Sequence, residues 1–200
     1  MQGGTAILRP CCCMAMGAFL LEVFMKHVLS VLVKNQPGVL VRVASMFSRR
    51  EFNIESLTVG ETEKSEFSRI TVVVSGDENI VDQVMKQLGK LPDVEVVKRL
   101  NEGSSVYRIM TLIKVQADDT NRLDVLKMAE LFGARVIDVQ PTTLIFEITG
   151  SEDKVKAFNR VLSSYKVLEV IQTGFTGLER GEHTILEYCE EREYYGKNLL

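Results

Sequence analysis

The chain has 200 residues, 46% of them hydrophobic, which is enough for one large domain or two small ones with buried cores. Its net charge of -3 gives no basic surplus for holding a phosphate backbone, so nucleic acid is a poor first candidate for a partner. Two histidines and no C-x-x-C pair leave little material for a metal site or a histidine-based catalytic triad.

Residues 1–24 contain an apolar stretch, residues 14–24, that imitates a secretory signal. The stretch is shorter than the roughly 20 apolar residues that span a bilayer, and no convincing cleavage site follows it. We therefore interpret residues 1–24 as an upstream extension or a mistaken start, because Met25 opens a strand-like run. Three contiguous cysteines at 11–13 and the isolated Cys189 are interpreted as reduced thiols of a cytoplasmic protein.

The first structural unit is expected from residue 25 to residue 101. Residues 27–34 are rich in Val and Leu, which is typical of a buried strand, and Pro37 and Gly38 end that strand. Apolar residues then recur at helical spacing over 39–49 and again over 77–88. Further strands are predicted at 53–59, 67–75 and 94–100, so the order of elements is βαββαβ.

The same order of elements repeats from residue 104 to residue 181. Strands are predicted at 107–115, 135–139, 144–148 and 167–173, with helices at 121–132 and 153–163. We conclude that the fold class is α+β, with two tandem ferredoxin-like domains, each an antiparallel sheet with two helices on one face. Such sheets leave edges and one face to be covered, so self-association is expected. Residues 182–200 form an acidic tail, interpreted as an exposed helix or an arm on a partner.

The segment N-Q-P-G-V-L at 35–40, followed by F-N-I-E-S-L at 52–57, predicts a small polar socket. Gly38 opens a helix whose first amides favour a carboxylate, and the side-chain amides of Asn35 and Asn53 can meet either charged end of an amino acid. We expect Val39, Leu40 and Ile54 to receive an aliphatic side chain. The spacing alone fits equally well an interpretation in which both asparagines are turn residues and Pro37-Gly38 only starts a helix.

Two other classes of function find little support in the residues. An enzyme would need a nucleophile, an acid or a metal, and Glu55 is the only carboxylate beside the expected socket, where a role on the strand surface is favoured. We assign no catalytic residues and no metal ligands. An amino-acid-responsive transcriptional regulator would need a DNA-reading helix, and both repeats use all the predicted helices.

The run N-Q-P-G-V-L-V-R-V-A-S-M-F-S-R-R-E-F-N-I-E-S-L-T-V-G resembles the ACT domain of the regulatory, or small, subunit of acetolactate synthase. The resemblance continues through F-S-R-I-T-V at 67–72, K-Q-L-G-K-L-P-D-V at 86–94 and I-K-V-Q-A at 113–117. R-V-I-D-V at 135–139 and G-L-E-R-G at 177–181 extend it into the second repeat.

This resemblance implies a non-catalytic regulatory subunit that activates the catalytic subunit and confers feedback inhibition by valine in branched-chain amino-acid biosynthesis. It implies a homodimer formed through ACT domains, with valine bound between the paired domains by Asn35, Gly38 and Asn53, and with Val39, Leu40 and Ile54 as further candidates for the same pocket. No cofactor is implied in this chain; thiamine diphosphate, Mg and FAD are expected on the catalytic subunit. A stand-alone ACT-domain amino-acid sensor is the alternative, and whether isoleucine or leucine also binds stays open.

The second repeat departs from the pattern of the first. It carries A-D-D-T-N where the first repeat carries N-Q-P-G-V, so it lacks the proline, the glycine and the aligned asparagine. We expect at most one competent effector site per chain.

Overall fold

The structure is a computed structural model that describes residues 25–188, so our interpretations of residues 1–24 and 189–200 lie outside it. The first unit consists of β1 (Lys26–Lys34), α2 (Val39–Arg49), β2 (Ile54–Glu61), β3 (Phe67–Ser75), α3 (Glu78–Leu88) and β4 (Val94–Leu100). The second consists of β5 (Ser105–Gln116), α4 (Arg122–Leu131), β6 (Arg135–Val139), β7 (Thr143–Gly150), α5 (Glu152–Leu162) and β8 (Val167–Gln172). No helix in the described range is long and apolar enough to cross a membrane.

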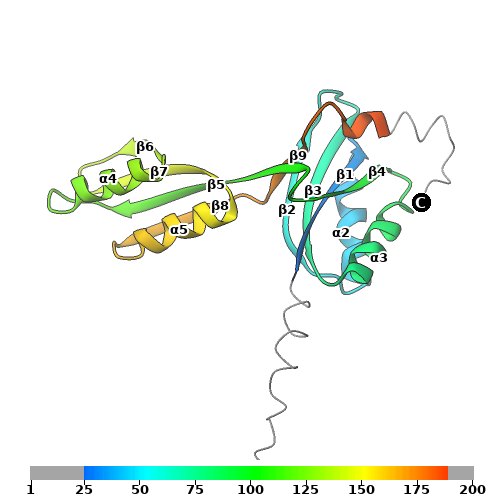
Figure 1. The fold of residues 1–200 in the computed structure, drawn as a ribbon, viewed down its shortest axis with the longest axis horizontal. Coiled ribbons are helices and arrows are strands. Elements are labelled where there is room, and N and C mark those ends of the chain that lie inside the picture. Colours follow the sequence, from blue (N-terminus) through cyan, green and yellow to red (C-terminus); the bar gives the residue numbers. More distant parts are fainter. Residues whose placement is uncertain (1–24, 189–200) are drawn as a thin grey trace, which may run out of the picture.

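Each unit is built on an antiparallel sheet with the same strand order. The first sheet runs β2-β3-β1-β4 and the second runs β6-β7-β5-β8, so the first strand of each unit is central and the second is at an edge. This is the order expected of a βαββαβ unit, and the predicted pair of tandem ferredoxin-like domains is confirmed. Figure 1 shows the two units side by side, with β5 running from one into the other.

One further strand was missed by the sequence analysis. β9 (Thr176–Glu179) pairs antiparallel with the first four residues of β5, and it returns the chain to the first unit. Its sequence, T-G-L-E, is short and contains a glycine, so it carries no alternation of apolar and polar residues that would predict a strand. β5 also begins earlier than predicted, because residues 105–108 form this extra pairing.

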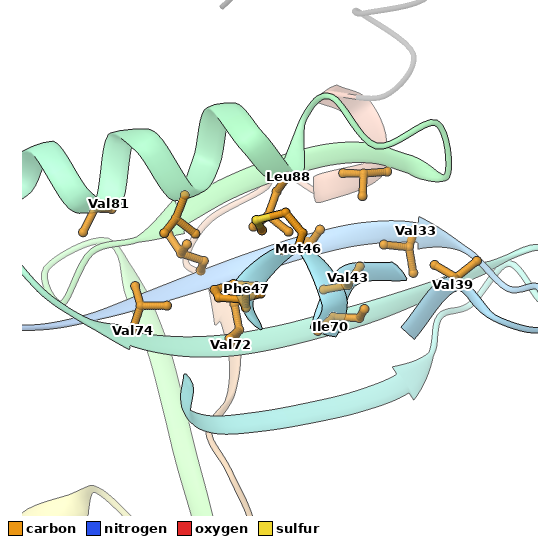
Figure 2. Close-up of a cluster of buried hydrophobic side chains, with 14 residues drawn as sticks. Val33, Val39, Val43, Met46, Phe47, Ile70, Val72, Val74, Val81 and Leu88 are labelled. Atoms are coloured by element: carbon orange, nitrogen blue, oxygen red, sulfur yellow. The ribbon is translucent and has the colours of Figure 1, made fainter. Parts of the chain in front are cut away.

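The core of the first unit lies between its sheet and its two helices (Figure 2). α2 has a wide apolar stripe, and α3 contributes Val81, Val84 and Leu88 from the same side. The buried side chains of α2 are Val39, Val43, Met46 and Phe47. They meet the alternate residues of β3 that point to this face, which are Ile70, Val72 and Val74.

The other face of the first sheet is also covered. Tyr107, which lies within the β5–β9 pairing, and Phe175, which precedes β9, pack against Val28, Val73 and Leu100. Their two aromatic rings are edge to face at 5.9 Å. Further along the same face, Ile185 and Leu186 are buried against Leu32 and Val96. The sheet of the first unit is therefore sandwiched between helices and the chain that returns from the second unit.

The beginning of the C-terminal tail is thus not the exposed acidic helix that the sequence suggested. Residues 185–188 are helical, and Thr184 and Glu187 exchange side-chain to backbone hydrogen bonds of 3.0 and 3.3 Å, which form a capping box. Ile185 and Leu186 are only 7% and 8% exposed. The sequence did not predict the burial of Ile185 and Leu186, because they are only two apolar residues in an acidic segment and show no periodicity.

Leu186→Ala should lower the free energy of unfolding by about 2 kcal/mol, because it removes a buried side chain and leaves a cavity over Leu32. The measurement is the denaturant midpoint of the full chain. Leu131→Ala is the matched control, since Leu131 is 79% exposed. Equal midpoints for the two variants would show that the tail does not pack on the sheet.

Candidate functional site

The start of α2 is an open set of backbone donors. Gly38 is the N-cap residue and has φ 86°, in the left-handed region that favours glycine. No side chain caps the helix, and within the described residues the amides of Leu40 and Val41 have no hydrogen-bond partner. A Cβ built on Gly38 would come no nearer than 3.9 Å to any neighbour, the guanidinium of Arg42, so the approach to these amides is unobstructed. Such a helix start favours a carboxylate.

Asn35 lies beside this helix start. Its backbone N–H donates to the carbonyl of Glu66 at 2.7 Å, and its side-chain Nδ2 donates to the carbonyl of Ser65 at 3.0 Å. These bonds orient the side chain and leave its Oδ1 as an acceptor for a ligand ammonium group.

Arg42 and Asp93 were not anticipated near this end of the sheet. The Nε of Arg42 lies 2.6 Å from Oδ2 of Asp93, which ties the first turns of α2 to the residue before β4. The pair places a guanidinium close to the approach to Gly38, with its charge offset by the Asp93 carboxylate. The sequence could have placed Arg42 near this helix start, because it lies one helical turn after Gly38.

The three aliphatic candidates differ in what they present. Val39 is only 3% exposed and packs in the core, so its side chain is not available to a ligand, contrary to expectation. Leu40 is 42% exposed on the outer surface of α2. Ile54 is half-buried and packs against the edge of the core.

Asn53 lies at the opposite end of the sheet from Asn35. Lys34, next to Asn35, pairs with Phe67, whereas Ile54, next to Asn53, pairs with Val74. Seven residues along β3 correspond to about 23 Å. The two asparagines therefore do not converge within one chain, and a site that uses both needs the pairing of ACT domains that the resemblance implies. The reason is that α2 runs antiparallel to β1 and returns the chain to the other end of the sheet before β2 begins.

The corresponding end of the second unit carries a different set of side chains. Arg122 donates to the carbonyls of Ala117, Gln140 and Pro141 at this place, and Asp118 accepts from the backbone and the hydroxyl of Thr120. The hydrogen bonds from Thr120 lower the pKa of the Asp118 carboxyl. α4 also has no side-chain cap, and its N-cap Asn121 has φ -120°. The second unit therefore differs from the first in lacking the left-handed glycine and in placing an arginine and an aspartate at this end of the sheet.

Nothing near the site suggests acid–base or metal chemistry in the described part of the chain. Glu55 forms an ion pair with Lys26 at 3.1 Å and accepts a hydrogen bond from the hydroxyl of Ser75, so it is a partnered strand residue. Within residues 25–188 there is no group of three His, Cys, Asp or Glu side chains placed to hold a metal ion.

Comparison with protein families and curated proteins identifies the family of the chain. Residues 29–96 match the family described as AHAS small subunit-like ACT domain, and residues 108–181 match the family described as small subunit of acetolactate synthase. The chain belongs to the acetolactate synthase small-subunit family. A probable acetolactate synthase small subunit of Archaeoglobus fulgidus is 48% identical over 157 residues, which cover 78% of this chain and 98% of the relative.

Other members of the acetolactate synthase small-subunit family agree. The small subunit of Mycolicibacterium smegmatis is 46% identical over 159 residues, covering 80% of this chain and 94% of that protein. The crystal structure of the acetolactate synthase small subunit from Thermotoga maritima is similar with a TM-score of 0.75 and 38% identity, over 80% of this chain and 99% of that one. The fold, with an ACT domain as its first unit, and the predicted resemblance are thereby confirmed.

Gly38→Ala should lower the free energy of unfolding by about 1 kcal/mol, since an L side chain is strained at φ 86°. Gly60→Ala is the matched control, because a Cβ there meets nothing within 4 Å and no positive φ is involved. The check is the difference between their denaturant midpoints. Equal stability of the two variants would contradict the backbone conformation described for the start of α2.

Proposed function

We propose that this chain is the non-catalytic regulatory subunit of an acetolactate synthase, which binds and activates the catalytic subunit and transmits feedback inhibition by valine. The observation that carries the proposal is the open helix start at Gly38 in a chain whose two repeats both match the small-subunit family. The reaction, with its thiamine diphosphate, Mg and FAD, takes place on the catalytic subunit.

The effector site is formed between two copies of the chain. One copy cannot supply both asparagines to a molecule as small as valine, since the separation of about 23 Å along β3 is several times the length of an amino acid. A dimer with a two-fold axis can bring an Asn35 and an Asn53 together. In a symmetric pair each surface meets its own equivalent, so the Asn53 end of one copy can be brought to the Gly38 end of the other.

The outer edge of β2 is the surface that makes this possible. β2 pairs only with β3 among the described strands, so its second row of backbone groups is open to another strand. If two copies of β2 pair antiparallel across the axis, the start of each strand lies beside the end of the other. Because Asn53 directly precedes β2, this pairing carries it toward the partner's α2.

Exposed apolar residues support the edge of β2 as the contact between two copies. Val59 on β2 is 44% exposed, and Leu40 and Val41 on α2 are 42% and 67% exposed. A β2-to-β2 contact would cover these side chains together with the free strand edge. Leu40 would then face the aliphatic side chain of the bound amino acid.

The chemistry of this composite site suits a zwitterionic amino acid. The free amides at the start of α2 favour its carboxylate, while the Oδ1 groups of Asn35 and of the partner's Asn53 can accept from its ammonium group. A ligand held between two copies shifts their relative placement by the difference in its affinity for the alternative arrangements. Feedback inhibition therefore requires no chemistry in this chain.

Asn53→Ala should abolish valine inhibition and leave activation of the catalytic subunit intact, because the residue lies at the effector site and carries no element of the core. The measurement is acetolactate formation by the catalytic subunit of the same host, mixed with the variant, with and without valine. Asn159→Ala, a helix substitution in the second unit, is the control. Normal valine sensitivity of Asn53→Ala would refute the site, whereas no complex and no activation by the unaltered chain would favour a stand-alone sensor.

A mixture of Gly38→Asp and Asn53→Ala chains tests the composite site directly. Each variant alone should bind no valine. In a mixed dimer, one site carries both changes and the other carries neither, so random mixing restores about a quarter of the sites of the unaltered protein. Calorimetry with valine gives the number of sites. A mixture that stays inactive after subunit exchange would show that both residues act within one chain.

A further inference from the structure

The face of the first sheet that lies away from α2 and α3 carries a polar row across all four strands. The strand pairings align Thr58 of β2, Thr71 of β3, Ser30 of β1 and Lys98 of β4. The rows on either side of it are mostly apolar, with Val28, Val73 and Leu100 on one side and Leu32 and Val96 on the other. Three hydroxyl groups in a line are unusual on a covered sheet face, because burial of polar groups costs free energy unless they are hydrogen-bonded.

Two of these hydroxyls have no partner. Ser30 is 2% exposed, and neither its Oγ nor the Oγ1 of Thr58 makes a hydrogen bond in the described residues. Each unsatisfied buried hydroxyl costs about 1–3 kcal/mol. Ser56, Ser105 and Thr111 also carry buried hydroxyls without a partner, but Ser30 and Thr58 differ from them because both line cavities that Arg69 also lines.

An arginine beside the row is also unpaired. Arg69 lies next to Leu32 and Gly60 in the neighbouring strands, and its Nε is buried without an acceptor. Within the described residues it forms no ion pair or hydrogen bond, and only the more distant charge of Glu63 compensates it. Burial lowers the pKa of the Arg69 guanidinium, as expected for a cation that lacks a close anion.

Two adjoining cavities lie over these residues. Ser30, Arg69 and Lys98 line one of about 290 Å³, and Thr58, Thr71 and Arg69 line the other, of about 390 Å³. Both are bounded by Gly177 and Leu178 of β9, so the chain returning from the second unit forms their outer wall. Their volumes are in the range of small-molecule sites.

We propose that this hydroxyl-lined space beneath β9 is a second small-molecule site, which takes a small hydroxycarboxylate with its carboxylate on Arg69 and its hydroxyl among Ser30, Thr58 and Thr71. Lys98 is not available as the main anion-binding group, because it is held by Glu179 and by the ring of Tyr188 at 3.4 Å. Arg69 is the free cation of the pocket, and its planar fork matches a carboxylate.

The residues that line the pocket limit the class of ligand that it can bind. Glu61 and Glu63 line the larger cavity on the side of the β2–β3 turn, where they repel a second strong negative charge and can accept from a hydroxyl group. A dianion such as phosphate is therefore disfavoured compared with a monocarboxylate. The site is separate from the start of α2, which lies at one end of the sheet and on its helical side.

The test is a titration of the isotope-labelled full chain with sodium L-lactate in the millimolar range, followed by nuclear magnetic resonance. We expect saturable shifts of the Arg69 Nε–H signal and of the backbone amides of Ser30, Thr58 and Thr71. Inorganic phosphate should not produce them. Arg69→Met should weaken lactate binding by on the order of tenfold or more, while Arg135→Met, at an exposed position of the second sheet, should not.

Stability measured without ligand separates a binding role from a structural one. Arg69→Met and Ser30→Ala should melt at the same temperature as the unaltered chain or higher, because each removes an unpaired polar group. Gly38→Asp should bind lactate normally, whatever happens to valine. The proposal is overturned by any of three results: absent shifts with lactate, equal shifts in Arg69→Met, or loss of lactate binding in Gly38→Asp.

Discussion

The packing of α2 antiparallel to β1 determines how the first unit can function. The helix buries Val43, Met46 and Phe47 against the sheet, and this contact fixes its direction. One end of α2 then presents Gly38 beside Asn35, and the other end delivers Asn53 to the start of an edge strand. Two groups close in sequence become remote in space. The proposed site, which uses both, must therefore be completed by a second copy, and we propose the free edge of β2 as the contact.

The return of the chain through β9 gives the molecule a second property. It closes the outer face of the first sheet with Tyr107, Phe175, Ile185 and Leu186, and so links the stability of the first unit to segments that follow the second. Lys26 adds an ion pair across the same junction, at 3.0 Å from Glu152 at the start of α5. The hydrogen bond with Glu152 raises the pKa of Lys26, so this link is present at neutral pH.

Much of this architecture could be predicted from the sequence. Helical periodicity placed α2 and α3, and valine-rich runs placed β1 and β3, because in these elements burial and local propensity agree. The site was predicted less well. Residue type identified Gly38, and the left-handed φ of 86° explains why glycine stands there. Proximity of Asn35 and Asn53 was inferred from sequence spacing, which carries no information on the direction of the intervening helix.

Other features had no local signal at all. β9 is a strand only because β5 offers it an edge, and the polar row on the outer face appears only when residues from four strands are aligned by their pairing. The difference between the two repeats at this helix start says more about the role of Gly38 than the sequence of either repeat alone. The second unit keeps the fold with Asn121 as the N-cap of α4 in place of a left-handed glycine, so Gly38 is not a requirement of the fold.

The most direct test of the central claim is the effect of valine on self-association of the chain, measured by sedimentation equilibrium. A ligand bound between two copies stabilises the dimer by mass action, so the dissociation constant of the dimer should fall as valine is added. It should not change in the presence of glycine, which lacks the aliphatic side chain. If calorimetry shows that valine binds and the dissociation constant of the dimer stays the same, the site lies within one chain and the account is wrong.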